Sequence, residues 1–282
     1  MKSAKKIISF SAIVIAFVSC SSCEPEVKKD PEIPVNDPIH EKPVIPVLDY
    51  SIVATVPHDT TAFTEGLLFH DNKLFESTGS PDNMPELKSV LGIVDMKTGK
   101  LDAKVELDKK AYPFGEGMVI LNEKIYQVTY KEQTGFIYDV KTFKKIGQFN
   151  YSNKEGWGLT TDGTYIIMSD GTNNLTYFDA EMKPVKTLAV NENGYAADAL
   201  NELEYIKGFI YANIYTTGYI VKIDPKTGNI VAKINLTPKF YEMHTAHPNT
   251  LEMNGIAYDS IADKIYVTGK LWPVMYEVKF DH

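Results

Sequence analysis

The chain has 282 residues, 44% of them hydrophobic, and a formal net charge of −8. This length allows one large or two small domains. The 29 basic residues form no block along the sequence, so the composition argues against a nucleic-acid partner.

The N-terminal 19 residues have the features of a targeting segment. Three lysines among the first six residues precede an apolar stretch at positions 7–18, which is too short to span a membrane. The tetrapeptide Phe17-Val18-Ser19-Cys20 resembles a bacterial lipobox with a poor first position. We therefore expect residues 1–19 to be a lipoprotein signal peptide and Cys20 to carry the lipid, with Cys23 as the second choice and ordinary signal cleavage as the alternative. The expected location is the bacterial cell envelope, facing the periplasm or displayed on the outer-membrane surface.

Residues 20–49 have the composition of a linker. Six prolines are interspersed with charged residues between positions 24 and 48. Such a segment cannot bury enough apolar surface to fold, and its prolines keep it extended. We expect a stalk that holds a domain of residues 50–282 away from a membrane. That domain contains no cysteine, so disulfides play no part in its stability.

A pattern of two short strands joined by a turn occurs five times within residues 50–282. The clearest copy begins at Phe114-Gly115-Glu116-Gly117 and continues, after a turn at 122–124, into a second strand at 125–131. Equivalent positions in the five copies are Glu65, Glu116, Trp157, Glu202 and Asn254, separated by 41 to 52 residues. A repeat of roughly 40–50 residues made of short strands is typical of propeller blades.

The first four copies continue into a third and a fourth strand, whereas the fifth copy has no fourth strand. A spare strand at residues 51–56 precedes the first copy. Because an unpaired edge invites aggregation, we expect this N-terminal strand to complete the last blade. The sequence therefore predicts an all-β fold, a five-bladed β-propeller closed by the N-terminal strand. Only short turns or helical pieces are expected, at 195–200 and 238–247.

Standard catalytic motifs are mostly absent from the sequence. There is no P-loop, no dinucleotide-binding fingerprint and no His-Glu-x-x-His metal motif. His244 and His247 have the spacing of a ligand pair, but their position beside Pro248 and Asn249 favours an exposed loop over a metal site.

Polar and aromatic residues are expected to gather at one mouth of the propeller. The first strand of each blade lines the central channel, so residues near its start converge with residues just after the second strand. The first group is Phe63, Glu65, Phe114, Glu116, Trp157, Asn201 and Glu202, and the second is Tyr130, Lys131, Tyr215, Lys270 and Trp272. Burial and crowding raise the pKa of a carboxyl group and a nearby lysine lowers it, so one glutamate could be a proton shuttle. Alternatively, the glutamates only bind backbone amides around the channel.

Eight short motifs along residues 50–280 carry a family resemblance. Among them are Phe63-Thr64-Glu65-Gly66-Leu67, Phe114-Gly115-Glu116-Gly117 and Val267-Thr268-Gly269-Lys270-Leu271-Trp272-Pro273. In content and order they resemble the glutamine cyclotransferases, the papaya-type glutaminyl cyclases of plants and bacteria. The resemblance implies a five-bladed propeller that converts the N-terminal glutamine of peptides or proteins to pyroglutamate and releases ammonia. It also implies that no cofactor and no catalytic metal take part.

The resemblance implies a role for each of the gathered residues. Glu116 would transfer the proton, Lys270 would stabilise the tetrahedral oxyanion, and Asn201 would be a polar partner. The residues expected to bind the substrate are Phe63, Glu65, Phe114, Tyr130, Trp157, Glu202 and Tyr215. The chain departs from the family pattern at three of them: Glu65 stands where glutamine is usual, and Tyr130 and Tyr215 stand where the plant enzymes carry tryptophan. The tyrosines keep an aromatic wall, which predicts altered affinity, and Glu65 could strengthen amine binding or disturb the pKa of Glu116.

Two functions of other classes compete with the cyclase. A non-catalytic propeller could bind a peptide or glycan at the cell surface, because fold does not fix function. A metal-dependent hydrolase could use the channel glutamates and asparagines as ligands, and a chelator would distinguish it. The presence of both Glu116 and Lys270 favours the cyclase, and we expect it to be a lipid-anchored monomer that acts on peptides or proteins with N-terminal glutamine.

Overall fold

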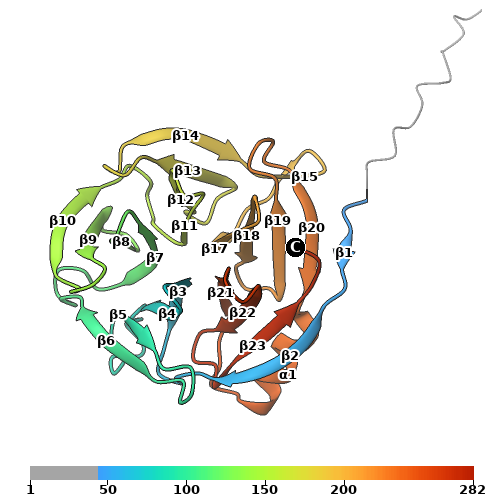
Figure 1. Ribbon diagram of the computed structural model, residues 1–282, viewed down its shortest axis with the longest axis horizontal. Helices are drawn as coiled ribbons and strands as arrows, with labels where there is room; N and C mark the ends of the chain where they lie inside the picture. Colours follow the sequence, from blue (N-terminus) through green and yellow to red (C-terminus); the bar gives the residue numbers. More distant parts are fainter. Residues whose placement is uncertain (1–43) are drawn as a thin grey trace, which may run out of the picture. The chain divides into compact units, whose positions relative to one another are not determined.

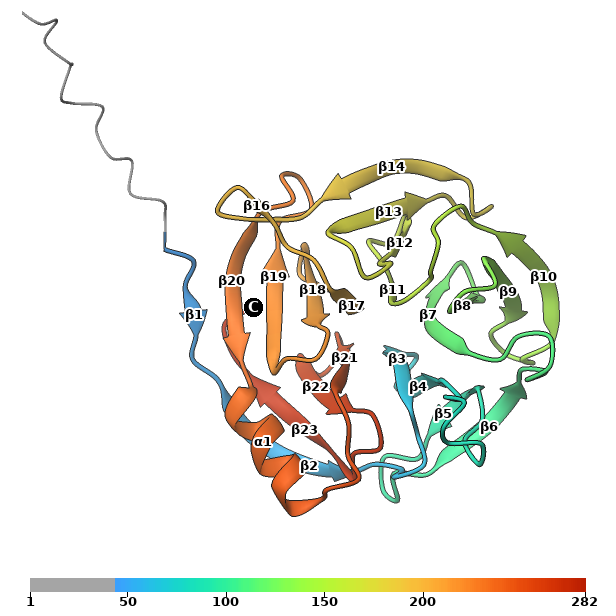
Figure 2. The same cartoon turned by 180° about the vertical axis from the view of Figure 1, so that it is seen from behind.

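The computed structural model describes residues 44–282. The expected signal peptide, Cys20 and nearly all of the expected linker lie outside the described residues. In the described part, five blades of antiparallel strands surround a centre (Figure 1), as the repeat predicts. Their arrangement is the same seen from behind (Figure 2).

Each blade runs outward from an inner strand near the centre. Blade 1 consists of β3 (Thr64–His70), β4 (Lys73–Thr78), β5 (Val90–Val94) and β6 (Leu101–Glu106). Blade 2 consists of β7 (Gly115–Leu121), β8 (Lys124–Thr129), β9 (Thr134–Asp139) and β10 (Lys145–Asn150). Blade 3 consists of β11 (Leu159–Thr161), β12 (Ile166–Met168), β13 (Asn174–Phe178) and β14 (Pro184–Ala189). Blade 4 consists of β17 (Leu200–Ile206), β18 (Phe209–Ile214), β19 (Tyr219–Ile223) and β20 (Ile230–Asn235). Blade 5 consists of β21 (Met253–Asp259), β22 (Lys264–Gly269), β23 (Val274–Lys279) and β2 (Ser51–Pro57).

The spare N-terminal strand is β2 (Ser51–Pro57), the outermost strand of blade 5. It pairs antiparallel with β23, so the first long strand of the described chain lies against the last. The shorter strand β1 (Val47–Leu48) pairs parallel with β20 at the outer edge of blade 4. Leu48 and Tyr50, on either side of the expected linker boundary at residue 49, are partly buried and pack against the hydrophobic core.

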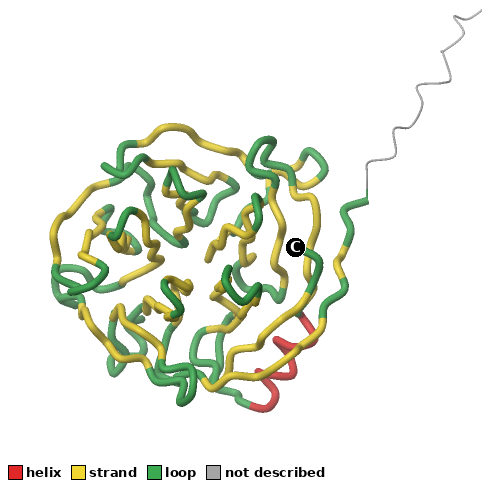
Figure 3. Tube along the Cα trace, viewed as in Figure 1, coloured by secondary structure: helices red, strands yellow, loops and turns green. Residues whose placement is uncertain are grey.

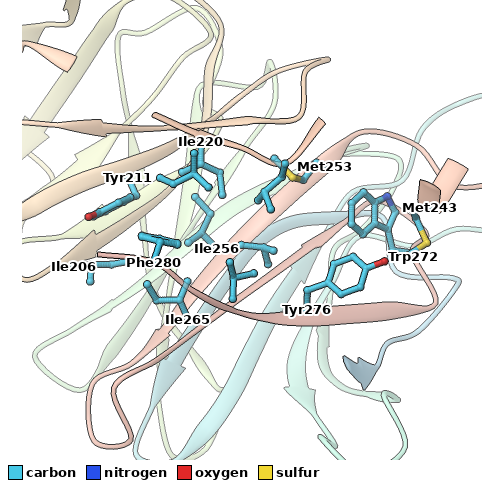
Figure 4. Close-up of a cluster of buried hydrophobic side chains, with 14 residues drawn as sticks. Ile206, Tyr211, Ile220, Met243, Met253, Ile256, Ile265, Trp272, Tyr276 and Phe280 are labelled. Atoms are coloured by element: carbon cyan, nitrogen blue, oxygen red, sulfur yellow. The ribbon is translucent and has the colours of Figure 1, made fainter. Parts of the chain in front are cut away.

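Burial explains the difference between inner and outer strands. Every residue of β7 is buried, whereas exposed positions recur along β10 at the rim. An inner strand has neighbouring blades on both faces, whereas an outer strand has one face in solvent. Large hydrophobic clusters accordingly lie between blades. In the cluster of Figure 4, Tyr211 and Ile220 from blade 4 meet Ile256 and Ile265 from blade 5.

The described chain contains one helix, α1 (Thr237–Ala246), which follows β20 in the sequence and is drawn in red in Figure 3. Pro238 lies in its first turn, where the missing amide hydrogen removes no helical hydrogen bond. Met243 anchors the helix in the cluster that contains Trp272. A helical piece at 238–247 was expected and is present, whereas residues 195–196 form β16 (Tyr195–Ala196), paired with β15 (Asn191–Glu192). Within residues 44–282, no helix has the length and apolar character needed to cross a bilayer.

Two glycines allow the inner strands to approach closely at the centre. A Cβ atom on Gly117 would lie 2.4 Å from the carbonyl oxygen of Trp157, and one on Gly158 would lie 2.3 Å from that of Asn201. The amide of Gly117 donates to the Trp157 carbonyl at 2.8 Å. The glycine that follows Glu116 and the one that follows Trp157 thus keep neighbouring blades in direct backbone contact, which holds the preceding side chains close together.

Candidate active site

One pocket opens at a mouth of the central channel. Its volume is about 470 Å³, part of it open to solvent. Its lining residues are Phe63, Glu65, Phe114, Glu116, Tyr130, Trp157, Asn201, Tyr215 and Lys270. All nine were expected to meet at the mouth from their positions in the repeat. All five blades contribute, with Trp157 coming from the loop before β11 and Lys270 from the loop after β22.

Bulges at the start of the inner strands present the polar side chains. In four blades the register between first and second strands shifts at this place, between Thr64 and Gly66 in blade 1 and between Gly115 and Met118 in blade 2. A bulge twists a strand locally and re-aims its side chains, and bulges are frequent beside active sites. Glu65 and Glu116 lie in these two bulges. The repeat predicted the positions of Glu65 and Glu116, but no feature of the sequence predicted the bulges.

A buried ion pair forms the charged part of the pocket. Lys270 Nζ lies 2.8 Å from Glu65 Oε1, and both side chains are almost fully buried. The second oxygen, Glu65 Oε2, accepts a hydrogen bond of 3.0 Å from Asn254 Nδ2. Lys270 Nζ also lies 4.5 Å from the centre of the Phe63 ring, within range of a cation–π interaction. Lys270 is therefore fixed by a carboxylate on one side and by an aromatic face on another.

Burial shifts the pKa values of the two pocket carboxyl groups, Glu65 and Glu116, upward. Burial, opposed by the charge of Lys270, raises the pKa of Glu65 to about 7. Burial and then the charge of Glu65 raise the pKa of Glu116 well above its usual value. The pKa of Lys270 is raised, because the charges of Glu65 and Glu116 outweigh the opposing effect of burial. The raised pKa of Lys270 favours its charged form, and the raised pKa of Glu116 makes this carboxyl group readier to take up a proton.

Aromatic rings form the walls around these groups. Phe63 packs edge-on against Phe114 at 5.8 Å between ring centres, and Phe114 lies 5.7 Å from Tyr130. On the other side Trp157 and Tyr215 meet edge-on at 5.4 Å. Such walls accept an aliphatic side chain and exclude water.

Asn201 presents an unsatisfied acceptor in this pocket. Its Oδ1 atom is buried and has no hydrogen-bond partner among the described residues. A buried polar atom without a partner is costly, and an acceptor that lines a pocket can be satisfied by a ligand N–H group.

Comparisons with known proteins agree with this geometry. The family model of the glutamine cyclotransferases matches residues 18–280. The chain belongs to the glutamine cyclotransferase family. A glutaminyl-peptide cyclotransferase from Arabidopsis thaliana is 39% identical over 234 residues, which are 82% of this chain and 71% of that protein. The crystal structure of Myxococcus xanthus glutaminyl cyclase superposes with a TM-score of 0.74 at 31% identity, covering 84% of this chain and 98% of the other.

Glu202 lies outside the pocket of this cyclotransferase, although it was expected to bind substrate. Its Oε1 accepts the amide of Leu67 at 3.2 Å and its Oε2 accepts the amide of Ile256 at 2.7 Å. The ladder of blade 4 shifts register between Leu200 and Leu203. As a result Asn201, and not Glu202, lines the pocket together with Glu116. A slip of one residue reverses the side to which a strand residue points. For Glu202, binding of backbone amides is the observed arrangement.

The other expected residues lie near the mouth or away from it. Lys131 is exposed at the rim, with its Nζ 4.4 Å from the centre of the Tyr130 ring. Trp272 is buried behind the pocket, where its indole N–H donates to the Leu251 carbonyl at 3.0 Å. His244 lies in α1 rather than in a loop, and His247 ends that helix. Among residues 44–282, no group of three or more metal-ligating side chains is gathered.

The position of Glu202 predicts a structural role that a substitution can test. In a Glu202→Ala variant, two buried backbone amides lose their acceptor, at a cost of about 1–3 kcal/mol each. We expect urea denaturation to show a lower free energy of unfolding, with a turnover by the folded fraction close to that of the wild type. The exposed Glu181→Ala change is the control. A folded Glu202→Ala variant of normal stability with a tenfold loss of kcat/KM would contradict the structural role.

Proposed function

We propose that the pocket binds the N-terminal glutamine of a peptide or protein and closes it to pyroglutamate, with Glu116 carrying the proton and without a metal. Glutaminyl-peptide cyclotransferase activity follows from family membership and from the two relatives. The observation that supports the assignment of Glu116 is that the two pocket carboxyl groups, Glu65 and Glu116, have different partners. Glu65 is engaged by Lys270 and Asn254, which leaves Glu116 as the pocket carboxyl group that can exchange a proton with substrate.

The reaction needs one proton carrier and one oxyanion partner. The substrate α-amine attacks the carbon of its own γ-carboxamide, a C–N bond forms, and Glu116 accepts the proton that the amine loses. The oxygen of the tetrahedral intermediate becomes negative beside Lys270, whose charge is already in place. Glu116 then returns the proton to the departing nitrogen, the old C–N bond breaks, and ammonia leaves. Because attack is intramolecular, a pocket that holds the folded-back side chain supplies much of the rate.

The remaining pocket residues suit a glutamine side chain. Phe63, Phe114 and Trp157 would contact its two methylene groups. Asn201 Oδ1, which lacks a partner among the described residues, would accept a hydrogen bond from the carboxamide or the α-amine. Tyr130 and Tyr215 would extend the wall toward the second residue of the peptide.

Ammonia release tests this function directly. The purified full-length chain should convert a glutamine–alanine dipeptide to its pyroglutamyl product with one ammonia per product, and EDTA should leave the rate unchanged. Ammonia is measured by a coupled enzymatic assay and the product by mass spectrometry. Turnover that EDTA abolishes and a divalent cation restores would support a metal-dependent enzyme instead. Binding of the dipeptide without ammonia would support the non-catalytic propeller.

The charge of Glu65 is expected to set the pH at which kcat/KM falls on the acid side of its pH profile. Glu116 must be deprotonated to accept the amine proton, so kcat/KM should rise with pH through its raised pKa. A Glu65→Gln variant removes the neighbouring negative charge that raises this pKa, and the acid limb should therefore move to lower pH. In a Glu155→Gln control the shift should be smaller, because Glu155 raises the pKa of Glu116 less than Glu65 does. An acid limb that does not move in Glu65→Gln would contradict the electrostatic coupling.

The location of the enzyme is a proposal from the N-terminal sequence. We infer that Cys20 carries a lipid, that the chain is anchored in the bacterial cell envelope, and that it acts as a monomer. Metabolic labelling with a radioactive fatty acid should mark the wild type and leave a Cys20→Ala variant unmarked. Label retained in that variant but lost in Cys23→Ala would assign the lipid to Cys23.

A further inference from the structure

A second buried ion pair lies outside the pocket, in blade 1. His58 Nε2 is 3.0 Å from Glu76 Oε1, and both side chains are completely buried. His58 belongs to the loop between β2 and β3, and Glu76 to β4. Neither residue lines the pocket, and the reaction described above uses neither.

The hydrogen-bond partners of His58 indicate that its ring is charged. Nδ1 lies 2.8 Å from the carbonyl oxygen of Trp272, which can only accept, so Nδ1 carries a proton. Nε2 faces a carboxylate oxygen that already accepts the hydroxyl of Thr64 at 2.7 Å. Both ring nitrogens therefore donate. The pKa of His58 is raised accordingly, since Glu76 and the Trp272 carbonyl together outweigh the opposing effect of burial, and the nearby charge of Asp59 adds to them.

Through these contacts His58 holds the loop that carries Lys270. The His58 ring binds the carbonyl of Trp272 and its backbone amide donates to the carbonyl of Pro273 at 2.9 Å. On the other side of the lysine, the Thr268 hydroxyl lies 3.4 Å from Nδ1. Leu271, the residue after Lys270, has a backbone φ of 61°. A residue other than glycine keeps this left-handed conformation only where its surroundings enforce it. Contacts on both sides of Lys270 supply that enforcement.

The same pair also holds the strand that carries Glu65. Thr64, whose hydroxyl donates to Glu76 Oε1, is the residue immediately before Glu65. The His58–Glu76 pair thus connects the neighbours of both partners in the pocket ion pair. Blades 1 and 5 meet here, and the distance between Glu65 and Lys270 depends on how they are joined.

We propose that His58 and Glu76 are positioning residues for cyclisation, and that their buried pair sets Lys270 against Glu65 beneath the substrate. The inference rests on the proposed function, because it assigns Lys270 a part in the reaction. A buried pair is weak evidence for stability, since apolar residues of similar volume can often replace it without loss. A charged pair at this place is therefore better explained by the geometry that it imposes on the loop of Lys270.

The test compares Glu76→Gln with Glu277→Gln in the full-length chain. Glu76→Gln keeps the shape of the side chain and removes the charge. Glu277→Gln breaks a different ion pair, which Glu277 forms with Lys264 at 3.0 Å within blade 5. This pair has no contact with Lys270. Displacement of a catalytic group by about 1 Å can cost roughly 10²-fold, so we expect kcat for the glutaminyl dipeptide to fall at least about tenfold in Glu76→Gln. KM should change much less, and Glu277→Gln should keep the wild-type kcat.

A spectroscopic readout separates this inference from the proposed function. In ¹⁵N-labelled wild type, the buried Lys270 ammonium should give a protected signal, assigned by its absence in Lys270→Met. We expect this signal to shift or broaden in Glu76→Gln and to persist in Glu277→Gln. A folded Glu76→Gln variant with wild-type kcat and an unchanged signal would overturn the inference. Absence of wild-type turnover would instead defeat the proposed function, while the signal would still report on positioning.

A milder substitution covers the case in which Glu76→Gln does not fold. Thr64→Val keeps the side-chain shape and removes only the hydrogen bond to Glu76. A severalfold loss of kcat with thermal stability close to that of the wild type is the expected result. Unchanged kcat in a folded Thr64→Val variant, together with an unchanged Lys270 signal, would count against the inference.

Discussion

Replacement of Glu116 by glutamine is expected to lower kcat for a glutaminyl dipeptide by about 10²–10⁴-fold, the usual contribution of a positioned acid–base group. Glutamine has nearly the same shape but can neither take the proton from the α-amine nor return it to ammonia. KM should change little, because the aromatic walls and Asn201 remain. Initial rates of ammonia release across a substrate series measure both parameters.

The matched control is Glu123→Gln, which alters an exposed glutamate in the turn of the same blade. It should keep wild-type turnover. A Glu116→Gln variant that is folded and retains more than about a tenth of the wild-type kcat would rule out Glu116 as the proton carrier and direct attention to Glu65.

Replacement of Lys270 by methionine is expected to lower both activity and stability. The oxyanion loses its charged partner, which costs about 10²–10³-fold in kcat. Glu65 is left as a buried carboxyl group without its counter-ion, and breaking one side of a buried pair typically costs about 3–5 kcal/mol. Steady-state kinetics and urea denaturation measure the two effects on the same preparation.

A double variant separates these two effects. In Lys270→Met with Glu65→Gln no unpaired charge remains, so much of the lost stability should return while kcat stays low. If activity returned together with stability, Lys270 would matter only for folding and not for the oxyanion.

The sequence predicted which residues gather at the pocket better than it predicted which side chains pair with one another there. The repeat predicted Glu116 near the start of a first strand and Lys270 just after a second strand, and these two kinds of position converge at one mouth. The pairing of Lys270 with Glu65, and its support by Asn254, could not be predicted, because it depends on side-chain directions set by bulges. A bulge inserts a residue without changing composition, so the sequence carries little sign of it.

The misplacement of Glu202 has the same origin. The sequence repeat aligned Glu202 with Glu116, but the bulge in blade 4 places Asn201 at the pocket and turns Glu202 toward backbone amides. Glutamate suits acid–base chemistry better than asparagine does, so the sequence alone favoured Glu202 over its neighbour Asn201. The one-residue shift in register that separates them is visible only in the structure.

The hydrogen bond between His58 and Trp272 joins residues 214 positions apart in the chain. Contacts of such large sequence separation form late in folding, because the closure of a long loop must precede them. The Glu65–Lys270 pair belongs to the same seam between the first and last blades. A partly folded chain that has assembled four blades would therefore have most of the pocket walls but no working centre. The appearance of activity during refolding should coincide with the final docking of the last blade, which makes catalysis itself a kinetic reporter of complete folding.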